Sequence, residues 1–259
     1  RDIGREMFLK RTWDWVAKYG ELIDAQLRRL GASCDWSRRR FTLDPSPSEA
    51  VKATFVNLYE KGLIYRGERI INWCTSCGTA LSDLEVEHQQ EEGTLYYIKY
   101  PLYQNGELLL VATTRPETLL GDTAVAVNPN DPRFSHLKNQ WAVLPVLGRT
   151  IPIIQDEMVA MDFGTGAVKI TPGHDPHDFE TSQRHDLDVL NIMNPDGTLN
   201  SVAGPYQGYD RYAARKELVE QLDREGLLDH VETYAHSVGH CQRSGDVVEP
   251  LVSKQWFVH

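Results

Sequence analysis

The sequence predicts an α+β fold in which helices come first and a β-rich domain follows. Up to about residue 64, apolar side chains recur at helical steps of three and four residues. From Ile70 onward the pattern changes to short runs rich in Val, Ile, Tyr and Thr, separated by Gly, Pro, Asn and Asp, as in strands and turns. Cysteines stand near both ends of this stretch, at Cys74, Cys77 and Cys241, and would bring the two ends together if they share one site.

The composition is that of a globular protein and excludes several classes. The 259 residues are 41% apolar and 25% charged, enough for one large domain or two to three small ones. A net charge of −10 argues against a protein that coats nucleic acid, although it allows a local basic groove. Four cysteines, two of them in a CxxC motif, indicate a reducing compartment and a metal. No apolar run reaches the length of a membrane span, and the missing initiator Met suggests a fragment of a longer protein.

Two helices are predicted in the N-terminal segment. The first covers residues 4–30, where apolar residues recur at helical spacing and Gly31 provides a stop. The second begins at Ser46 as N-cap, has Pro47 at the first helical position and Glu49 closing a capping box, and ends before Gly62. Between them, Cys34 is expected to be a small buried apolar residue.

The β-rich part alternates strands with turns and carries two helices. A short helix should follow Pro176, and a longer one should run from Asp210 as N-cap to Gly226. The predicted strands are 95–101, 107–113, 123–128, 141–146, 150–154, 166–171 and 188–193. The expected organisation is a helical connecting segment at 1–64, a β-rich domain at 92–232, and one stem module made of 65–91 and 233–259.

The cysteines of the stem have the spacing of a zinc knuckle. Cys74 and Cys77 are two residues apart, but Ser244 stands where a second CxxC motif after Cys241 would end. A tetrahedral zinc site needs four ligands, so His240 or His236 is expected to supply the fourth. The alternative is a knuckle that keeps its turn geometry without a metal.

A charged cluster lies in FGTGAVKITPGHDPHDFE, residues 163–180. Asp175 is expected to cap the short helix, with Asp178 as the carboxylate that closes the capping box. This structural role leaves unexplained Lys169, beside the Gly-rich turn, and His174, next to the cap. A dinucleotide fingerprint, a P-loop and a serine-nucleophile elbow are absent from the sequence, and a hard metal at the two His-Asp pairs is improbable on spacing.

A second stretch, VATTRPETLLGDTAVAV at residues 111–127, collects four threonines, Arg115 and Glu117 between apolar runs. It contains no Ser, Cys or His that could act as a nucleophile or base. It therefore suits a wall of hydroxyls and charges around a bound substrate, although β propensity alone also favours threonine in strands.

These motifs carry a family resemblance that extends over essentially the whole chain. TTRPET (113–118) with GDTAVAV (121–127), and GTGAVKITP (164–172) with HDP and DFE after it, resemble the two signature segments of the editing domain inserted into class I valyl-tRNA synthetases. RLGASCDWSR, NWC, CGTALSD and RSGDVVEP resemble the sequence around that insertion. Lys169 together with Asp175 favours the valyl over the leucyl and isoleucyl branches, whereas Gly173 and Ser244 depart from the valyl pattern. HIGH- and KMSKS-type sequences are missing, so no aminoacylation is expected from this chain alone, and ATP binding is expected only of the full-length enzyme.

The resemblance implies a fold and a reaction. The domain at 92–232 should be a β-barrel of six or more strands with peripheral helices. The reaction should be post-transfer editing, hydrolysis of the ester of threonyl-tRNA(Val), with Asp178 holding the α-ammonium and with Lys169 and Asp175 contacting the side chain or the terminal adenosine and placing the water. The implied substrate-binding residues are Thr113, Thr114, Arg115, Glu117, Thr118, Phe163, Gly164, Thr165, Gly166, Thr171 and His174.

Partners and alternatives follow from the same resemblance. The expected partners are the 3′ end of tRNA(Val) and the rest of a synthetase polypeptide in the cytoplasm, with neither DNA nor a membrane. Editing itself should need no cofactor, and any zinc should be structural. The alternatives are an isoleucyl- or leucyl-type editing domain with another rejected amino acid, an insertion that binds tRNA without catalysis, or a free-standing metallohydrolase.

Overall fold

The structure, a computed structural model, describes residues 3–259 in two compact units, one ending at Tyr65 and including Val258–His259, the other Arg66–Phe257. The first unit contains α1 (Gly4–Tyr19), α2 (Leu22–Arg29) and α3 (Pro45–Glu60). The single helix predicted over 4–30 is wrong, because the chain breaks at Gly20, a residue with low helix propensity. None of the described residues in these three helices is buried within the chain.

Helix α3 begins two residues earlier than predicted and uses a different cap. Asp44 is the N-cap and Pro45 takes the first helical position, where its missing N–H costs nothing. The predicted capping box of Ser46 and Glu49 is therefore wrong. The carboxylate of Asp44 instead accepts a hydrogen bond from the backbone N–H of Phe41 at 2.9 Å.

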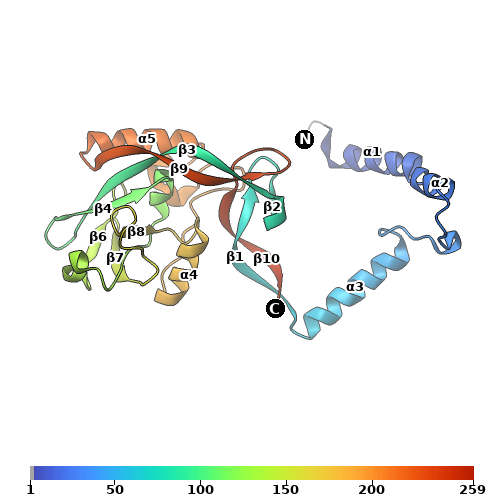
Figure 1. Cartoon of the computed structure of the whole chain (residues 1–259), viewed down its shortest axis with the longest axis horizontal. Coiled ribbons are helices and arrows are strands. Elements are labelled where there is room, and N and C mark those ends of the chain that lie inside the picture. Colours follow the sequence, from blue (N-terminus) through green and yellow to red (C-terminus); the bar gives the residue numbers. More distant parts are fainter. Residues whose placement is uncertain (1–2) are drawn as a thin grey trace. The chain divides into compact units, whose positions relative to one another are not determined.

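Three sheets build the second unit and the strands that lead into it (Figure 1). The first sheet has the order β10-β1-β2, with β1 at Ile64–Cys74, β2 at Thr79–Leu81 and β10 at Glu249–Val258. The second has the order β4-β3-β9, with β3 at Val86–Pro101, β4 at Leu108–Thr113 and β9 at Leu228–Cys241. The β3–β9 ladder runs from Val86↔Cys241 to Ile98↔Leu228, so it passes through positions 92 and 232 as one continuous ribbon.

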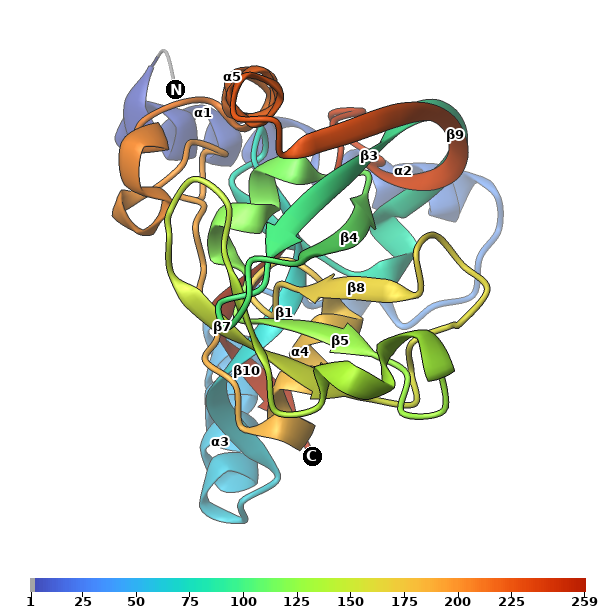
Figure 2. The ribbon, with the colours of Figure 1, turned by 90° about the vertical axis from the view of Figure 1, so that its left-hand side faces the viewer.

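The third sheet contains Lys169 of the charged segment 163–180. Its order is β6-β7-β5-β8, with β5 at Ala124–Val127, β6 at Trp141–Val143, β7 at Thr150–Gln155 and β8 at Ala167–Ile170. Strand β4 lies beside β8, but no ladder of hydrogen bonds joins these two strands in the described chain (Figure 2). The expected closed β-barrel is therefore wrong, and the sheets are open. Gly164 and Gly166, both with positive φ, turn the chain just before β8 and limit this strand to four residues.

Two helices complete the second unit: α4 (Pro176–His185) and α5 (Arg211–Arg224). Both start where the sequence predicts, because the carboxylates of Asp175 and Asp210 cap the first backbone N–H groups. Helix α5 lies along β3 and β9 and buries Ala214, Leu218 and Leu222 in the main hydrophobic core. Short 3-10 helices occur at Trp36–Arg38, Asp83–Glu85, Pro116–Gly121, Pro132–Leu137 and Ser201–Tyr206.

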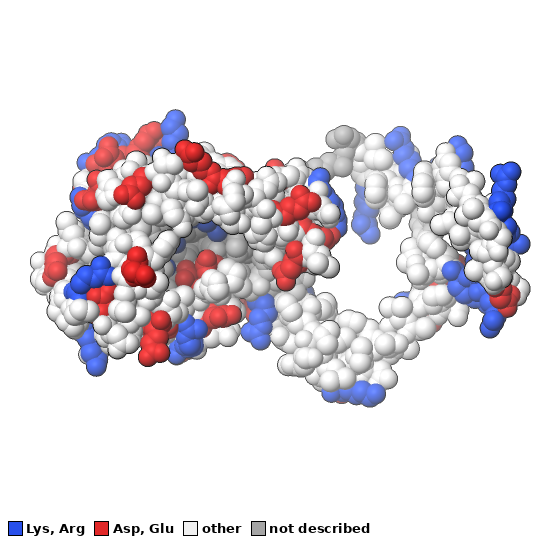
Figure 3. All heavy atoms as spheres, in the orientation of Figure 1, with Lys and Arg blue, Asp and Glu red and all other residues white. Residues whose placement is uncertain are grey.

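The predicted strand at 188–193 is wrong. No strand forms there; instead the backbone N–H of Ile192 donates to the Nε2 of His174, and the carbonyl of Leu190 packs against Gly173. This segment therefore packs against the turn before α4. Within residues 3–259, no helix combines the length and the apolar character that crossing a bilayer requires. Acidic and basic side chains intermingle over the visible face of the β-rich unit (Figure 3).

Candidate functional site

A buried polar cluster lies where β8 meets the 3-10 helix Pro116–Gly121. The ammonium of Lys169 on β8 donates to the hydroxyl of Thr118 at 2.7 Å, to Asp122 Oδ1 at 3.3 Å, and to the hydroxyl of Thr171. The Thr171 hydroxyl donates to Asp122, and Tyr100 donates to the other carboxylate oxygen at 2.7 Å. Because all three N–H groups of Lys169 have partners within the protein, this side chain acts on its surroundings through its charge and through the hydroxyls that it orients.

Two carboxylates stand at the start of α4, next to this cluster. Asp175 caps the helix by accepting from the backbone N–H groups of His177 and Asp178 at 2.8 and 3.1 Å. Asp178 does not close the predicted capping box; its Oδ2 accepts from the backbone N–H of Thr171 at 2.8 Å. Burial, together with the neighbouring charge of Asp175, raises the pKa of Asp178 to about 7, against the opposing effect of Lys169. A carboxyl group that titrates near neutrality at a helix start is a candidate for binding or proton transfer.

His174 is a buried support for the site. Its Nε2 accepts from Ile192 at 3.0 Å, and the side chain is only 1% exposed. Burial lowers the pKa of His174 to about 3, and the charges of Arg115 and Lys169 act in the same direction. The imidazole is therefore neutral at physiological pH and holds the 188–193 segment in place.

A second charged cluster joins the threonine-rich stretch to α5 and β10. Glu117 is fully buried and forms a bidentate pair with Arg215 of α5, at 2.7 and 2.8 Å. Arg115 pairs with the buried Glu249 of β10 and donates to the carbonyl of His174 at 3.1 Å. Arg115 therefore holds the backbone just ahead of Asp175 and connects it to the stem strand β10.

This connection gives a first testable expectation. Replacing Glu249 with glutamine removes the negative charge that faces Arg115 and Arg211, which lies 2.7 Å from the other Glu249 oxygen. Because hydrogen bonds to buried charged groups contribute about 1.5–3 kcal/mol, we expect Glu249→Gln to lower the free energy of unfolding by about that amount. Urea unfolding measures the change. Glu220→Gln, an exposed position on α5, is the matched control and should change stability by less than about 0.5 kcal/mol. Equal stability of the two variants would contradict the proposed connection.

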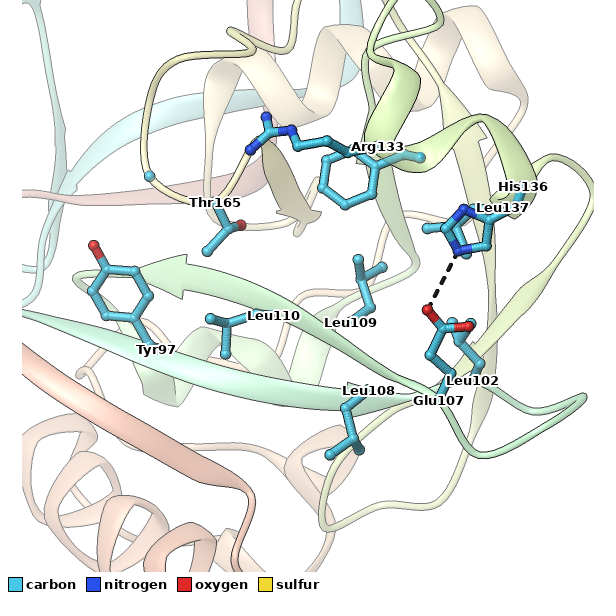
Figure 4. Close-up of a pocket in the computed structure, with 12 residues that line it drawn as sticks. Tyr97, Leu102, Glu107, Leu108, Leu109, Leu110, Arg133, His136, Leu137 and Thr165 are labelled. Carbon is cyan, nitrogen blue, oxygen red and sulfur yellow. Dashed lines mark ion pairs between the residues drawn. The ribbon is translucent and has the colours of Figure 1, made fainter.

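The Gly-rich turn and the remaining threonines border two cavities. Gly164 and Thr165 line a cavity of about 460 Å³ together with three leucines of β4, and Arg133 and His136 stand at its rim (Figure 4). Phe163 is half exposed and makes an edge contact with Tyr234, whereas Gly166 packs directly under the Arg133 guanidinium. Thr113 accepts from the backbone of Arg115, and Thr114 lines a second cavity, of about 570 Å³, with Arg115 and Arg215.

The three stem cysteines come together. The sulfurs of Cys74, Cys77 and Cys241 all lie within 4.8 Å of one another. Neither predicted histidine joins them: His240 is held by the carbonyl of Gly245 and by Glu91, and His236 stacks on Tyr234. Cys34, expected to be buried, is exposed in this chain.

Several of the predicted site residues are therefore neighbours, and others are not. Lys169, Thr118, Thr171 and Asp178 form one cluster around Asp122. Gly164 and Thr165 line the separate β4 cavity, and Phe163 contacts Tyr234. Sequence reasoning missed Asp122, Tyr100, Glu249, Arg211 and Arg215. A lone carboxylate between the apolar runs LL and AVAV was the available signal for Asp122.

One family model and several curated relatives match nearly the whole chain. The family model for class I tRNA synthetases (I, L, M and V) matches residues 1–259. Valine–tRNA ligase of Carboxydothermus hydrogenoformans is 58% identical over 99% of this chain and 29% of its own length. The corresponding enzymes of Dehalococcoides mccartyi and Thermotoga maritima are 55% and 52% identical over 100% and 99% of this chain, and 29% and 30% of their own lengths. The chain thus spans under a third of the curated relatives it matches. Among solved structures, the chain is similar to a LeuRS of Agrobacterium radiobacter K84 in a ternary complex with tRNA and LeuAMS. The match covers 90% of this chain and 40% of the LeuRS chain, with 18% sequence identity and a TM-score of 0.45.

Proposed function

Because the chain belongs to the class I tRNA synthetases (I, L, M and V), we propose that it is the editing domain of a valine–tRNA ligase. Its reaction is hydrolysis of the ester that joins a mischarged threonine to the terminal adenosine of tRNA(Val). Its partners are the 3′ end of that tRNA and the rest of the ligase polypeptide. High identity to valine–tRNA ligases over 99–100% of the chain supports the valyl assignment over the isoleucyl and leucyl alternatives.

One observation carries the hydrolytic assignment: Asp178, with a pKa of about 7, lies beside a fixed array of hydroxyls and one buried ammonium. An aminoacyl ester is already activated, so its hydrolysis needs a positioned water, a carboxylate for the α-ammonium, and positive charge near the developing oxyanion. In this proposal Asp178 binds the ammonium with the lone pairs that Thr171 leaves free, and Lys169 supplies the charge. Asp175 holds the first turn of α4 so that Asp178 keeps its position.

The surrounding residues are assigned by the same proposal. Thr113, Thr114 and Arg115 border the pocket for the adenosine and amino acid, whereas Phe163 and the turn at 164–166 do not line it. Water attacks the ester carbonyl, the bond from that carbon to the ribose oxygen breaks, and free threonine and tRNA with a regenerated ribose hydroxyl leave. The threonine-rich stretch has no Ser or Cys nucleophile and no His base that could activate one of its threonines, which favours direct attack by water.

Selectivity follows from the polarity of the site. A hydrophobic pocket cannot strongly reject an isostere that adds a hydroxyl, a limit for which valyl-tRNA synthetases facing threonine are the standard example. A second site can require that hydroxyl, because valine would leave a polar partner unsatisfied at a cost of about 1–3 kcal/mol. We therefore expect this chain to hydrolyse threonyl-tRNA(Val) at least about 5-fold faster than valyl-tRNA(Val), and up to about 150-fold faster.

The experiment is deacylation of both esters, preformed on the same tRNA, under single-turnover conditions. Valyl-tRNA(Ile), the tRNA for isoleucine mischarged with valine, serves as the comparison for another editing branch. Equal rates for the threonyl and valyl esters would contradict the proposed sieve. If no ester is cleaved even at high protein concentration while a threonyl-adenosine analogue binds, the chain is a binding insertion and the hydrolytic proposal is wrong.

A further inference from the structure

Two turns of the stem have the same backbone geometry but different chemistry. Residues 74–78 read CTSCG and residues 241–245 read CQRSG. In each turn the glycine N–H donates to the carbonyl of the first cysteine at 2.8 Å, and the glycine has a positive φ, 64° at Gly78 and 76° at Gly245. Ser244 therefore occupies the position in its turn that Cys77 occupies in the other.

The two turns face each other. The sulfurs of Cys77 and Cys241 are 3.9 Å apart, and the Ser244 hydroxyl is 3.3 Å from the sulfur of Cys74. Tetrahedral zinc with bonds to sulfur of about 2.3 Å places its thiolates about 3.8 Å from one another. The sulfurs of Cys77 and Cys241 thus have the separation of two corners of such a tetrahedron, and the Cys74 sulfur lies within 4.8 Å of both. The Ser244 hydroxyl lies next to the Cys74 sulfur, where a fourth cysteine of the paired turns would stand.

Serine is poorly suited to complete the tetrahedron. Its C–O bond is shorter than the C–S bond of cysteine, and zinc–oxygen bonds of about 2.0–2.2 Å are shorter than zinc–sulfur bonds, so a hydroxyl in an identical turn falls short of the metal position. The hydroxyl also accepts the backbone N–H of Asp246 at 3.2 Å. His240 is no substitute, because both its ring nitrogens have partners in Gly245 and Glu91.

We propose that Cys74, Cys77 and Cys241 form a three-thiolate zinc site whose fourth position is open to solvent and lies beside Ser244 without using it as a ligand. Cys74 and Cys241 are buried, whereas Cys77 and Ser244 are exposed, so the open position is on the solvent side. A small nitrogen donor such as imidazole can enter there. The site therefore exchanges its metal more readily than a closed four-cysteine site, while still joining the two halves of the stem.

The test uses the 259-residue chain and two variants at one residue, with cobalt(II) as a spectroscopic probe and zinc competing for it, in a phosphine reductant that keeps the thiols reduced. We expect the chain and Ser244→Ala to bind cobalt with affinities within about 3-fold of each other and with the same thiolate-to-cobalt absorption. Ser244→Cys should bind at least about 100-fold tighter, since even the loss of an outer-shell partner costs about 10–100-fold in affinity. Imidazole should alter the spectrum of the first two proteins and leave that of Ser244→Cys unchanged.

Three outcomes would overturn the inference. A loss of about 10-fold or more in affinity in Ser244→Ala would make serine a ligand. Retention of full affinity in Cys77→Ala, an exposed substitution, would remove that thiolate from the site. Cobalt absorption in Ser244→Cys but not in the unaltered chain would show that three thiolates do not suffice. None of these readouts depends on hydrolysis of an aminoacyl ester, so the stem site and the proposed function succeed or fail separately.

Discussion

Replacing Asp178 with alanine is expected to lower the rate of threonyl-tRNA(Val) hydrolysis by at least about 10²-fold, the effect typical of removing one preorganised polar group from a reacting centre. The carboxylate lies at the start of α4, where Thr171 and the Asp175 cap fix its position. Its removal leaves the substrate ammonium without a partner. Single-turnover deacylation measures the loss, and circular dichroism checks that the fold is retained.

The matched control is Glu180→Ala, which removes an exposed carboxylate two residues further along the same helix. It changes the net charge by the same amount and should alter the rate by less than about 2-fold. A folded Asp178→Ala protein with the activity of this control would show that Asp178 has no part in the reaction. Asp178→Asn adds a further distinction, because it keeps the acceptor for Thr171 and loses only the charge.

The raised pKa of Asp178 adds a pH signature to the same prediction. If the ionised carboxylate binds the ammonium, kcat/KM should rise with pH through about 7, after subtraction of spontaneous ester hydrolysis. The effect on stability has the opposite direction. Between the ordinary aspartate pKa of 3.8 and about 7 the native state binds more protons than the unfolded state, so this group makes stability fall as pH rises through that window. Asp178→Asn should flatten both profiles, and an unchanged rate profile would contradict the assignment.

Local capping rules correctly predicted where the helices near the site begin. The errors arose where a residue found its hydrogen-bond partner in a distant part of the chain. Asp175 and Asp210 cap α4 and α5 because each precedes helical N–H groups that have no other acceptor. The capping role predicted for Asp178 failed because Thr171, brought close by β8, offers a buried donor. Residues 188–193 have strand-like composition, yet Ile192 donates to His174 and not to a neighbouring strand. Those partners depend on tertiary packing, which a local pattern does not contain.

The candidate site shows the same division. The motifs singled out Lys169, Thr118 and Thr171, and these residues contact one another. The partner that binds them together, Asp122, was missed because a single acidic residue before a strand has no spacing that marks it. Asp122 and its hydrogen-bond donor Tyr100 are 22 positions apart in the sequence, and the paired residues Arg115 and Glu249 are 134 positions apart. Pairings of this length emerge only when the three sheets and α5 are assembled.

Replacing Lys169 with methionine is the second change expected to have a large effect, this time on stability. Asp122 is completely buried, and burial raises its pKa while Lys169 is the strongest influence that lowers it. Removing one partner of a buried ion pair costs about 3–5 kcal/mol, because the other charge remains without compensation. We expect a loss of that size in the free energy of unfolding, measured with urea at pH 8. Lys138→Met, at an exposed lysine of the same unit, should cost less than about 0.5 kcal/mol.

A double-mutant cycle with Asp122→Asn separates the ion pair from packing. Once Asp122 is neutral, loss of Lys169 no longer strands a charge, so the double variant should be more stable than the sum of the single losses predicts by about 1–3 kcal/mol. Acid should act in the same way. Without Lys169 the pKa of Asp122 rises further, so acidification protonates the carboxyl and removes its uncompensated charge. The loss of unfolding free energy in Lys169→Met should therefore be smaller at pH 5 than at pH 8. Additive losses, or a deficit independent of pH, would mean that Lys169 fills space in this cluster and that its charge does not stabilise the fold.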